Sequence, residues 1–365
     1  MASIVSVSSY PPPYLLKQET TTEFAKELFQ EDFRDIERLL KSFSNGQIEE
    51  RQFAVPLDWF RQDHSLQEKN DTYIKLATMF SVEVVRQCLQ SNVFLKKPVA
   101  EEEIDTIVFV SSSGMATPSI EARMMNELPF SPHTKRVPMW GLGCAGGAAG
   151  MSRAYEYCRA FPRANVLVVC VELCSLTFQR QDRTKSNLIG ASLFSDGVAC
   201  ALVSGDESDV LGRMKMPTRP LILGSSSTLM PDSEQVMGWD VKDTGLHVVF
   251  SRDIPNIIRH WLRPNVERFL ETYRLSLEQI EAFIAHPGGR KVLEAYEEAL
   301  SFSDEMTEYS RDILRHHGNM SSPTVLYVLE KFMKDTRDPG QYGLMAALGP
   351  GFCSELVLMQ WEAVH

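Results

Sequence analysis

Two stretches that lie far apart in the sequence repeat one pattern. Residues 104–111 and residues 280–286 each predict an apolar strand that runs into a glycine-containing turn and then a helix. Cys144 lies 33 residues after the end of the first stretch, and Asn319 lies 33 residues after the end of the second. An internal repeat of this kind predicts two similar α/β halves packed about a pseudo-twofold axis.

The rest of the chain fits this division. Strands alternate with helices from Ile104 onward, which is typical of α/β layers around a largely buried sheet. The stretch 206–220 reads as a connection, so we expect an N-terminal half at residues 1–215 and a C-terminal half at residues 216–365. The other predicted elements are strands at 3–8, 165–173, 198–203, 343–348 and 354–360, and amphipathic helices across 22–43 and 69–89.

Composition excludes several classes of function. The formal net charge of −11 argues against a nucleic-acid-binding surface and favours small-molecule partners. The seven cysteines form no CxxC pair and no cluster at metal-ligand spacing, so we expect reduced thiols and neither a disulfide framework nor a metal site. No signal peptide is recognisable, and no later segment is apolar over about eighteen residues. We therefore expect a cytoplasmic protein without an integral membrane segment.

Cys144 is the residue most plainly placed to react. It lies between an apolar strand and the helix predicted at 151–160, in a glycine-rich turn. Unpaired N–H groups at a helix N-terminus favour a thiolate over a thiol, and small neighbours let a substrate approach closely. Four other cysteines fall among apolar neighbours and read as buried small hydrophobes: Cys88, Cys158, Cys170 and Cys200.

His286 and Asn319 are the candidate partners of this thiol. His286 closes an apolar strand before a turn that Pro287 enforces, and we expect it to pair with the thiolate as an imidazolium or to donate to a thioester oxygen. A purely structural histidine is the alternative. Asn319 has the alternative role of a helix N-cap. Ser321 and Ser322 can cap that helix instead, which leaves the Asn319 amide free to stabilise an oxyanion or enolate.

Five motifs stand out together: GLGCAGGAAG around Cys144, AHPGGRKVLEAY around His286, HGNMSSPTVLYVL around Asn319, SLFSDGVACALV around Phe194, and the turn Gly349-Pro350-Gly351. Over nearly the whole chain they resemble the type III polyketide synthases of the thiolase superfamily. Within that family the chain is most similar to bacterial enzymes that make alkylpyrones from fatty acyl-CoA starters, and plant chalcone synthases are more distant. The resemblance implies a thiolase-like five-layered αβαβα core.

The resemblance also implies a mechanism without a metal or a permanently bound cofactor. Cys144 would carry the acyl starter taken from coenzyme A. His286 and Asn319 would bind malonyl-CoA and stabilise the enolate formed when carbon dioxide leaves, and this enolate would attack the acyl group. A long aliphatic starter and few condensations would give triketide or tetraketide alkylpyrones, although the residues before the Gly-Pro-Gly turn leave the mode of cyclisation open.

Cavity residues follow from the same resemblance. Phe194 would be a gatekeeper between tunnel and cavity. Val248 stands at the second plant gatekeeper and would widen the passage, whereas Trp239 replaces a small residue and would close one lobe. The other implied cavity residues are Cys174, Thr177, Ser321, Leu348, Gly349, Pro350 and Gly351.

Contacts to coenzyme A and to a second subunit are implied as well. The coenzyme A phosphates would meet Arg51 and Lys41, and the turn at Gly288 and Gly289 would also bind the coenzyme. The loop at residues 113–118 resembles one that crosses a homodimer interface, where Thr117 would enter the neighbouring cavity and the Thr117–Pro118 peptide bond would be cis.

Two other functions use the same residues. A ketoacyl synthase III-like condensing enzyme would take its substrate from an acyl carrier protein, and docking would require a basic patch that this acidic chain does not show. A non-catalytic scaffold with the thiolase fold would tolerate the loss of Cys144, whereas all three candidate residues are present.

Overall fold

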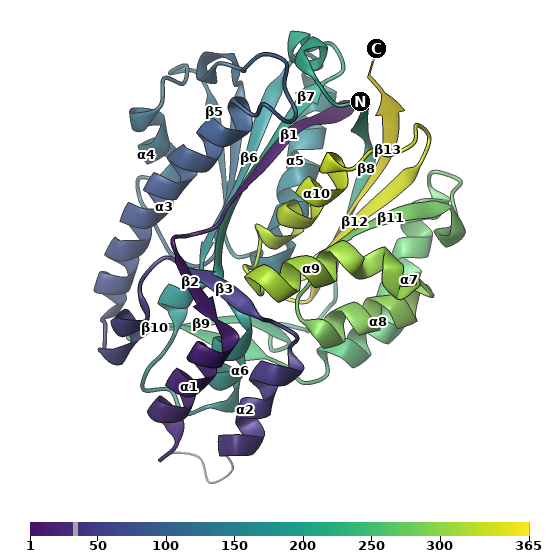
Figure 1. The fold of residues 1–365 in the computed structure, drawn as a ribbon. Coiled ribbons are helices and arrows are strands. Elements are labelled where there is room, and N and C mark those ends of the chain that lie inside the picture. The colour runs from purple at the N-terminus through teal and green to yellow at the C-terminus, as the bar shows by residue number, and fades with distance from the viewer. Residues whose placement is uncertain (32–35, 365) are drawn as a thin grey trace.

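The computed structural model describes residues 1–31 and 36–364 (Figure 1). Its strands are β1 (Ala2–Tyr10), β2 (Tyr14–Lys17), β3 (Glu50–Phe53), β4 (Thr106–Val110), β5 (Lys135–Met139), β6 (Asn165–Leu173), β7 (Asp196–Gly205), β8 (Thr218–Leu229), β9 (Met237–Lys242), β10 (Gly245–Phe250), β11 (Ile280–Ala285), β12 (Tyr342–Gly349) and β13 (Cys353–Ala363). Its α-helices are α1 (Gln18–Phe29), α2 (Ile36–Asn45), α3 (Leu66–Leu89), α4 (Ile120–Glu127), α5 (Gly146–Ala160), α6 (Lys185–Leu193), α7 (Ile254–Glu271), α8 (Arg290–Leu300), α9 (Glu308–His317) and α10 (Thr324–Lys334).

Among the described residues, one nine-stranded sheet runs through the molecule in the order β11-β12-β13-β8-β1-β7-β6-β4-β5. Its two ends repeat each other. The pair β4 and β6 is parallel and β6 and β7 are antiparallel, just as β11 and β12 are parallel and β12 and β13 are antiparallel. The sheet therefore has the internal duplication that the sequence predicts.

The two halves of the sheet meet at β1 and β8. These strands pair only at Ala2 with Ile222 and at Ser3 with Leu221. The boundary expected between residues 215 and 216 lies just before β8, the first strand of the second half. So short a junction lets the halves turn away from each other and leaves room for helices between them.

Helices α5 and α10 occupy this space, and both contact strands of the two halves. On the outer face of the first half, α3 packs on β1, β6 and β7. On the outer face of the second half, α7 and α8 share one hydrophobic core with β11, β12 and β13. This order of helices and sheets is the five-layered thiolase-like α/β arrangement, which confirms the predicted fold class.

The segments 18–31, 36–61 and 237–250 lie beside this core, at the lower end of the view in Figure 1. Helices α1 and α2 pack on each other and on α6, and the hairpin β9–β10 packs on α6 as well. The amphipathic pattern predicted across residues 22–43 corresponds to two helices, and its residues 32–35 lie outside the described part of the chain. In the part that is described, no helix is long and apolar enough to cross a membrane.

Candidate active site

Two of the three candidate residues, Cys144 and Asn319, lie at equivalent places in the two halves. Cys144 sits in the turn between β5 and α5, His286 directly follows β11, and Asn319 lies between α9 and α10. The sulfur of Cys144 lies 3.9 Å from both the oxygen and the nitrogen of the Asn319 side chain. The amide nitrogen of Asn319 also donates to the carbonyl of Gly288, two residues after His286, at 3.1 Å. Asn319 therefore links the cysteine turn to the histidine turn.

Small residues make this approach of the two halves possible. A β-carbon at Gly147, in the first turn of α5, would lie 2.3 Å from the carbonyl oxygen of Ser322. A β-carbon at Gly349 would lie 2.5 Å from the carbonyl oxygen of Leu142. Real β-carbons do not come so close to other atoms, so both positions require glycine. The Gly349-Pro350-Gly351 turn thus packs against the turn that carries Cys144, beside the buried Leu348.

The backbone of Asn319 is held by the segment that carries Phe194. Its N–H donates to the carbonyl of Leu193 at 3.0 Å, and its carbonyl accepts from the N–H of Ser195 at 2.9 Å. The side-chain oxygen of Asn319 accepts from the N–H of Ser321 at 2.8 Å. These bonds fix the orientation of the side-chain amide beside the sulfur. Asparagine suits this position because its side chain supplies both an oxygen that accepts from Ser321 and a nitrogen that donates to Gly288.

Ser321 and Ser322 do not cap α10, contrary to the prediction. The helix has no side-chain cap, and Pro323 stands at the N-cap position. Ser321 has a left-handed backbone with φ of 61°, and Ser322 donates instead to the carboxylate of Glu172 at 3.0 Å. Thr324 closes the turn by accepting from the N–H of Met320 at 3.0 Å. The turn is therefore built around Asn319 and Glu172.

His286 is buried, and within the described residues neither of its ring nitrogens has a hydrogen-bond partner. Its backbone N–H donates to the carbonyl of Ala346 at 2.8 Å, which continues the pairing of β11 with β12. Burial lowers the pKa of His286 to about 3. The imidazole is therefore neutral at rest, and both of its nitrogens are available to a ligand.

The prediction of a resting thiolate at Cys144 is wrong. Cys144 does stand before the first turn of α5, but it is only 7% exposed, and burial raises its pKa to about 11. Hydrogen bonds with Ser321 and Asn319 lower the pKa by less than burial raises it. With His286 also neutral, the resting pair is a thiol and an imidazole, because an apolar environment disfavours both charged forms.

Glu172 is a buried acid beside this site that the sequence reading missed. It is the last residue but one of β6, and its carboxylate accepts from the N–H of Ser112 at 3.0 Å and from the hydroxyl of Ser322. Burial raises its pKa to about 7, and its charge raises the pKa of Cys144. In the sequence, an acidic residue within the mostly apolar run of residues 165–173 indicates a buried carboxylate at this position.

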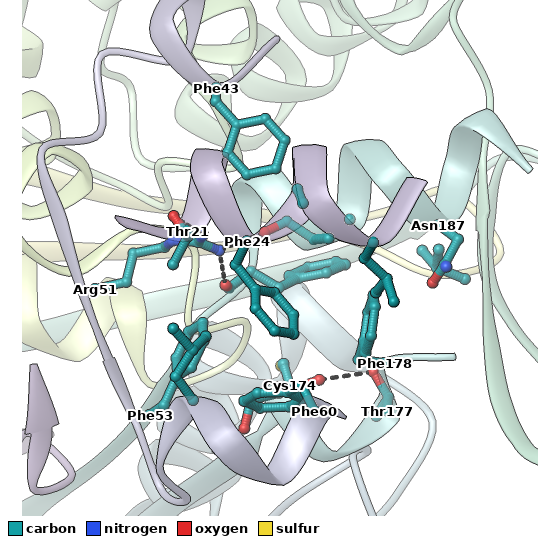
Figure 2. A pocket seen from close by; sticks show the side chains of 18 of the residues that line it. Thr21, Phe24, Phe43, Arg51, Phe53, Phe60, Cys174, Thr177, Phe178 and Asn187 are labelled. Atoms are coloured by element: carbon teal, nitrogen blue, oxygen red, sulfur yellow. Dashed lines mark hydrogen bonds between the residues drawn. The ribbon is translucent and has the colours of Figure 1, made fainter. Parts of the chain in front are cut away.

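A narrow pocket of about 70 Å³ extends from the side of this site (Figure 2). Its wall is largely aromatic and apolar, with Phe24, Phe43, Phe53 and Phe60 from the N-terminal segments. Five predicted cavity residues line it: Cys174, Thr177, Phe194, Trp239 and Val248.

Cys174 and Phe194 connect the pocket to two of the candidate residues, Cys144 and Asn319. The charge of a Cys144 thiolate contributes to raising the pKa of Cys174, and Phe194 pairs with Asn319 as a β-bridge. Trp239 and Val248 face each other across the β9–β10 hairpin, and the Trp239 ring lies 5.8 Å from that of Phe194. The sequence reading missed Phe250, whose ring stacks on Phe194 at 5.4 Å, two residues after Val248 on the same strand.

The assignment of Arg51 to coenzyme A phosphates is wrong, because its guanidinium is 1% exposed. It donates to the carbonyls of Ala191 and Phe194 at 2.7 and 2.6 Å and to the hydroxyl of Thr21 at 3.0 Å. Burial lowers its pKa to about 9, which the charge of Asp196 partly offsets. Arg51 therefore forms part of the wall of the pocket and holds α6 in place.

The other predicted contact residues are accessible. Lys41 is exposed on α2. Gly288 and Gly289 form the turn between His286 and α8, where Gly289 has a φ of 157°. Thr117 is exposed, and the Thr117–Pro118 peptide bond is cis, as the resemblance implies.

The cysteines elsewhere match their expected role. All seven are free and buried. Within residues 1–31 and 36–364 no group of three or more histidine, cysteine or acidic side chains is arranged to hold a metal ion.

Comparisons with known proteins show the family of this chain. The model of the chalcone and stilbene synthase N-terminal domain matches residues 1–207, and the C-terminal domain model matches residues 222–362. A candidate chalcone synthase of Bacillus subtilis (strain 168) is 51% identical over 363 residues, covering 99% of both chains. An alpha-pyrone synthesis polyketide synthase-like protein of Mycobacterium tuberculosis (strain ATCC 25618 / H37Rv) is 29% identical over 366 residues, covering 98% of this chain and 91% of that one.

A solved structure shows the same fold. The crystal structure of 1,3,6,8-tetrahydroxynaphthalene synthase from Streptomyces coelicolor A3(2), a bacterial type III polyketide synthase, matches with a TM-score of 0.90 at 27% identity and covers 99% of both chains. Two duplicated halves that bring a buried cysteine, a histidine and an asparagine together define a condensing acyltransferase of the thiolase type. The chain belongs to the chalcone and stilbene synthase family, the type III polyketide synthases.

Proposed function

We propose that this enzyme takes a long-chain fatty acyl group from coenzyme A onto Cys144 and extends it with malonyl-CoA to triketide and tetraketide alkylpyrones. The apolar pocket beside Phe194 is the observation that carries this proposal, because its phenylalanine-rich wall suits an alkyl tail. Removing apolar surface from water contributes about 25 cal/mol per Å². A malonyl-derived starter is short and polar, so it would not bury apolar surface against this wall.

Loading begins from the neutral thiol and imidazole. The proton of Cys144 moves to His286 as the sulfur attacks the acyl-CoA carbonyl, and it then passes to the departing coenzyme A thiolate. Burial opposes a lone thiolate at Cys144 but permits this transfer, since the charge never accumulates on an unpaired sulfur.

Condensation uses the two donors around the sulfur. Malonyl-CoA loses carbon dioxide, and the amide nitrogen of Asn319 and a ring N–H of His286 stabilise the enolate oxygen. The enolate carbon attacks the acyl carbon on Cys144, a carbon–carbon bond forms, and the Cys144 thiolate leaves and takes a proton from water through His286. The lengthened chain, now on coenzyme A, is transferred back to Cys144 in the same way before each further extension. After further extension, an enol oxygen attacks the terminal thioester, which closes the pyrone ring and releases coenzyme A.

Two further assignments belong to this proposal. We assign Lys41 and the Gly288-Gly289 turn to the binding of coenzyme A, since Arg51 is buried. Because the substrates are coenzyme A thioesters and all seven cysteines are free, we place the reaction in the cytoplasm.

A homodimer is also proposed. β5 is an edge strand of the sheet, its residues are largely exposed, and Met115, Val137 and Trp140 near it are 38, 37 and 51% exposed. An apolar face on an exposed sheet edge favours pairing with a second copy. Thr117 lies on this side and would enter the partner's cavity.

The test is to incubate the enzyme with palmitoyl-CoA and malonyl-CoA and to look for alkylpyrones by mass spectrometry. The Cys144→Ala variant should make none, whereas Cys144→Gln should still release carbon dioxide from malonyl-CoA if His286 and Asn319 carry that step. A lack of carbon–carbon bond formation with every acyl chain length would overturn the proposal.

A further inference from the structure

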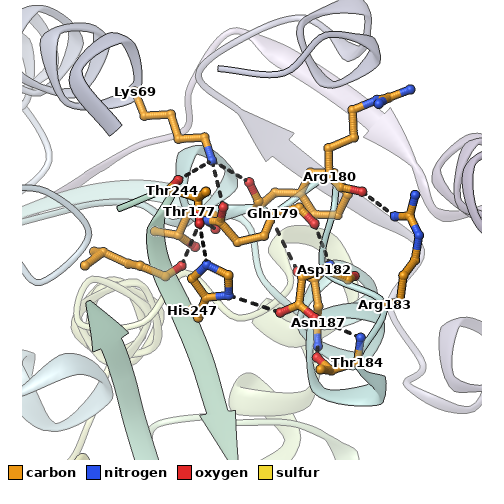
Figure 3. A network of polar contacts seen from close by, with 12 residues as sticks. Lys69, Thr177, Gln179, Arg180, Asp182, Arg183, Thr184, Asn187, Thr244 and His247 are labelled. Atoms are coloured by element: carbon orange, nitrogen blue, oxygen red, sulfur yellow. Dashed lines mark hydrogen bonds and ion pairs between the residues drawn. The ribbon is translucent and has the colours of Figure 1, made fainter. Parts of the chain in front are cut away.

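A polar network lies directly behind the wall of the apolar pocket (Figure 3). It joins three parts of the chain: Lys69 on α3, residues 175–184 after β6, and the β9–β10 hairpin. The network lines a second cleft of about 590 Å³. Phe60, Ser175 and Phe178 line both this cleft and the apolar pocket, so a single layer of chain separates the two.

Lys69 is the centre of this network. It is 9% exposed, and its ammonium group donates to the carbonyls of Phe178 and Thr244 at 3.1 and 3.2 Å and to the side-chain oxygen of Gln179 at 3.1 Å. These bonds use all three of its N–H donors. All three acceptors are neutral, and the charge of Asp63 only partly offsets the burial that lowers the pKa of Lys69 to about 8. A buried cation among neutral acceptors destabilises the folded state. Lys69 nevertheless joins the turn after β6 to the β9–β10 hairpin through these bonds.

Gln179 and Asn187 also hold the segment after β6 in place through hydrogen bonds. The side-chain nitrogen of Gln179 donates to the carbonyls of Thr177 and Leu246 at 2.9 and 3.1 Å. The side-chain nitrogen of Asn187 donates to the carbonyls of Gln179 and Asp182 at 2.8 and 2.9 Å. The turn is thereby bonded both to α6 and to the hairpin.

The hairpin is held from the same side. One ring nitrogen of His247 lies 2.8 Å from the hydroxyl of Thr244, and the other lies 3.2 Å from the carboxylate of Asp182. A β-carbon at Gly245, where φ is 134°, would lie 2.6 Å from the side-chain nitrogen of Gln179. The hairpin and the turn are therefore in close contact at this point.

These two elements carry much of the inner wall of the pocket. Thr177 and Phe178 come from the turn, and Trp239 and Val248 come from the hairpin. We propose that Lys69 is a positioning residue that sets which starter chain lengths the pocket accepts, by fixing the Phe178 turn relative to the β9–β10 hairpin. This inference rests on the proposed use of the pocket for an acyl starter.

The experiment measures acyl-CoA binding by calorimetry in a Cys144→Ala background, where no acyl transfer can occur. Lys69→Met keeps most of the side-chain stem and removes the ammonium group. We expect it to weaken palmitoyl-CoA binding about tenfold while hexanoyl-CoA binding changes less than about twofold, because only the long tail reaches the displaced wall. Lys69→Arg, which retains donors, should recover most of the loss. Lys75→Met, at an exposed position of the same helix, is the matched control and should change neither value.

Equal weakening of both ligands, or no weakening of palmitoyl-CoA, would overturn the role of Lys69. The melting temperature separates a loss of fold from a change of pocket, since a merely structural lysine would lower it and weaken both ligands together. Failure of the proposed function looks different. In that case the wild-type enzyme would form no pyrone, while Lys69→Met would still weaken palmitoyl-CoA selectively.

Discussion

The side-chain amide of Asn319 lies beside the sulfur of Cys144, with its oxygen and its nitrogen both 3.9 Å away. The oxygen is occupied by the N–H of Ser321, and the nitrogen retains one N–H beyond its bond to Gly288. A negative oxygen that forms next to the sulfur would therefore meet a donor that is already in place. This relationship joins the two halves of the molecule into one site.

Replacing Asn319 by Ala should slow decarboxylation of malonyl-CoA about 10²- to 10³-fold, because the enolate loses one preorganised donor. Acyl transfer from palmitoyl-CoA to Cys144 should change much less. Release of carbon dioxide and intact-protein mass spectrometry measure the two steps separately. Asn256→Ala, at an exposed position of α7, serves as the control. A parallel loss of both steps would contradict a specific role for the amide.

The pKa values of the resting site predict how Cys144 reacts with iodoacetamide. Burial raises the pKa of the thiol to about 11, so the thiolate fraction and the alkylation rate should rise about tenfold per pH unit between about pH 7 and pH 9. Mass spectrometry of the modified peptide gives the rate, and Cys144→Ala reports the background from the other cysteines. A rate that is already constant at pH 7 would instead show a thiolate–imidazolium pair.

Glu172 should make the stability of the protein depend on pH. Its pKa in the folded state is about 7, above the ordinary value of 4.5, so its contribution to stability is complete below about pH 4.5 and is lost as the pH rises through 7. Glu172→Gln keeps an acceptor for the N–H of Ser112 and removes the charge. The variant should melt at a higher temperature than the wild type at pH 8 and at a similar temperature at pH 5. A difference that does not vary with pH would contradict the raised pKa.

The relative positions of the candidate residues could be predicted from the sequence because they depend on the topology of the fold. The repeated spacing placed Cys144 and Asn319 at matching helix starts, and β4 and β11 do occupy matching positions in the sheet. Mostly apolar runs such as residues 165–173 predicted buried strands with the bounds that β6 has. Periodicity and turn residues determine these features, and both are visible in one sequence.

Features that depend on burial could not be predicted from the sequence in the same way. Arg51 reads as a surface charge in the sequence, yet backbone carbonyls of distant segments surround it. The helix-end position of Cys144 was visible, but the opposing effect of burial on its pKa was not. The stacking of Phe250 on Phe194 depends on how the β9–β10 hairpin folds back, which the sequence does not state.

Arg51 and Lys41 should respond differently to substitution. Arg51→Met leaves the carbonyls of Ala191 and Phe194 without their donor, so it should destabilise the fold by about 1–3 kcal/mol. Lys41→Ala should leave the melting temperature unchanged and raise the KM for malonyl-CoA severalfold, if the exposed amine contacts a phosphate. Thermal unfolding and steady-state kinetics separate the two effects. A normal KM in Lys41→Ala would remove this residue from the coenzyme A site.

Filling the pocket should shorten the starters that the enzyme accepts. Ala191 lines the pocket from α6 and is half-buried, so Ala191→Phe projects a ring into the space without a large change elsewhere. We expect kcat/KM for palmitoyl-CoA to fall at least tenfold, while that for hexanoyl-CoA changes little. Ala160→Phe, at an exposed position of α5, is the matched control. Unchanged use of palmitoyl-CoA would mean that the alkyl tail lies elsewhere.

The central claim is that the apolar pocket selects a long acyl starter for condensation at Cys144. The most direct measurement is a competition in which acetyl-, hexanoyl-, lauroyl- and palmitoyl-CoA are present at equal concentration with isotopically labelled malonyl-CoA. Mass spectrometry then identifies the starter in each product. The account predicts alkylpyrones that carry mostly the lauroyl and palmitoyl chains with two or three labelled extensions. Products built from labelled malonyl units alone, with no acyl starter, would contradict it.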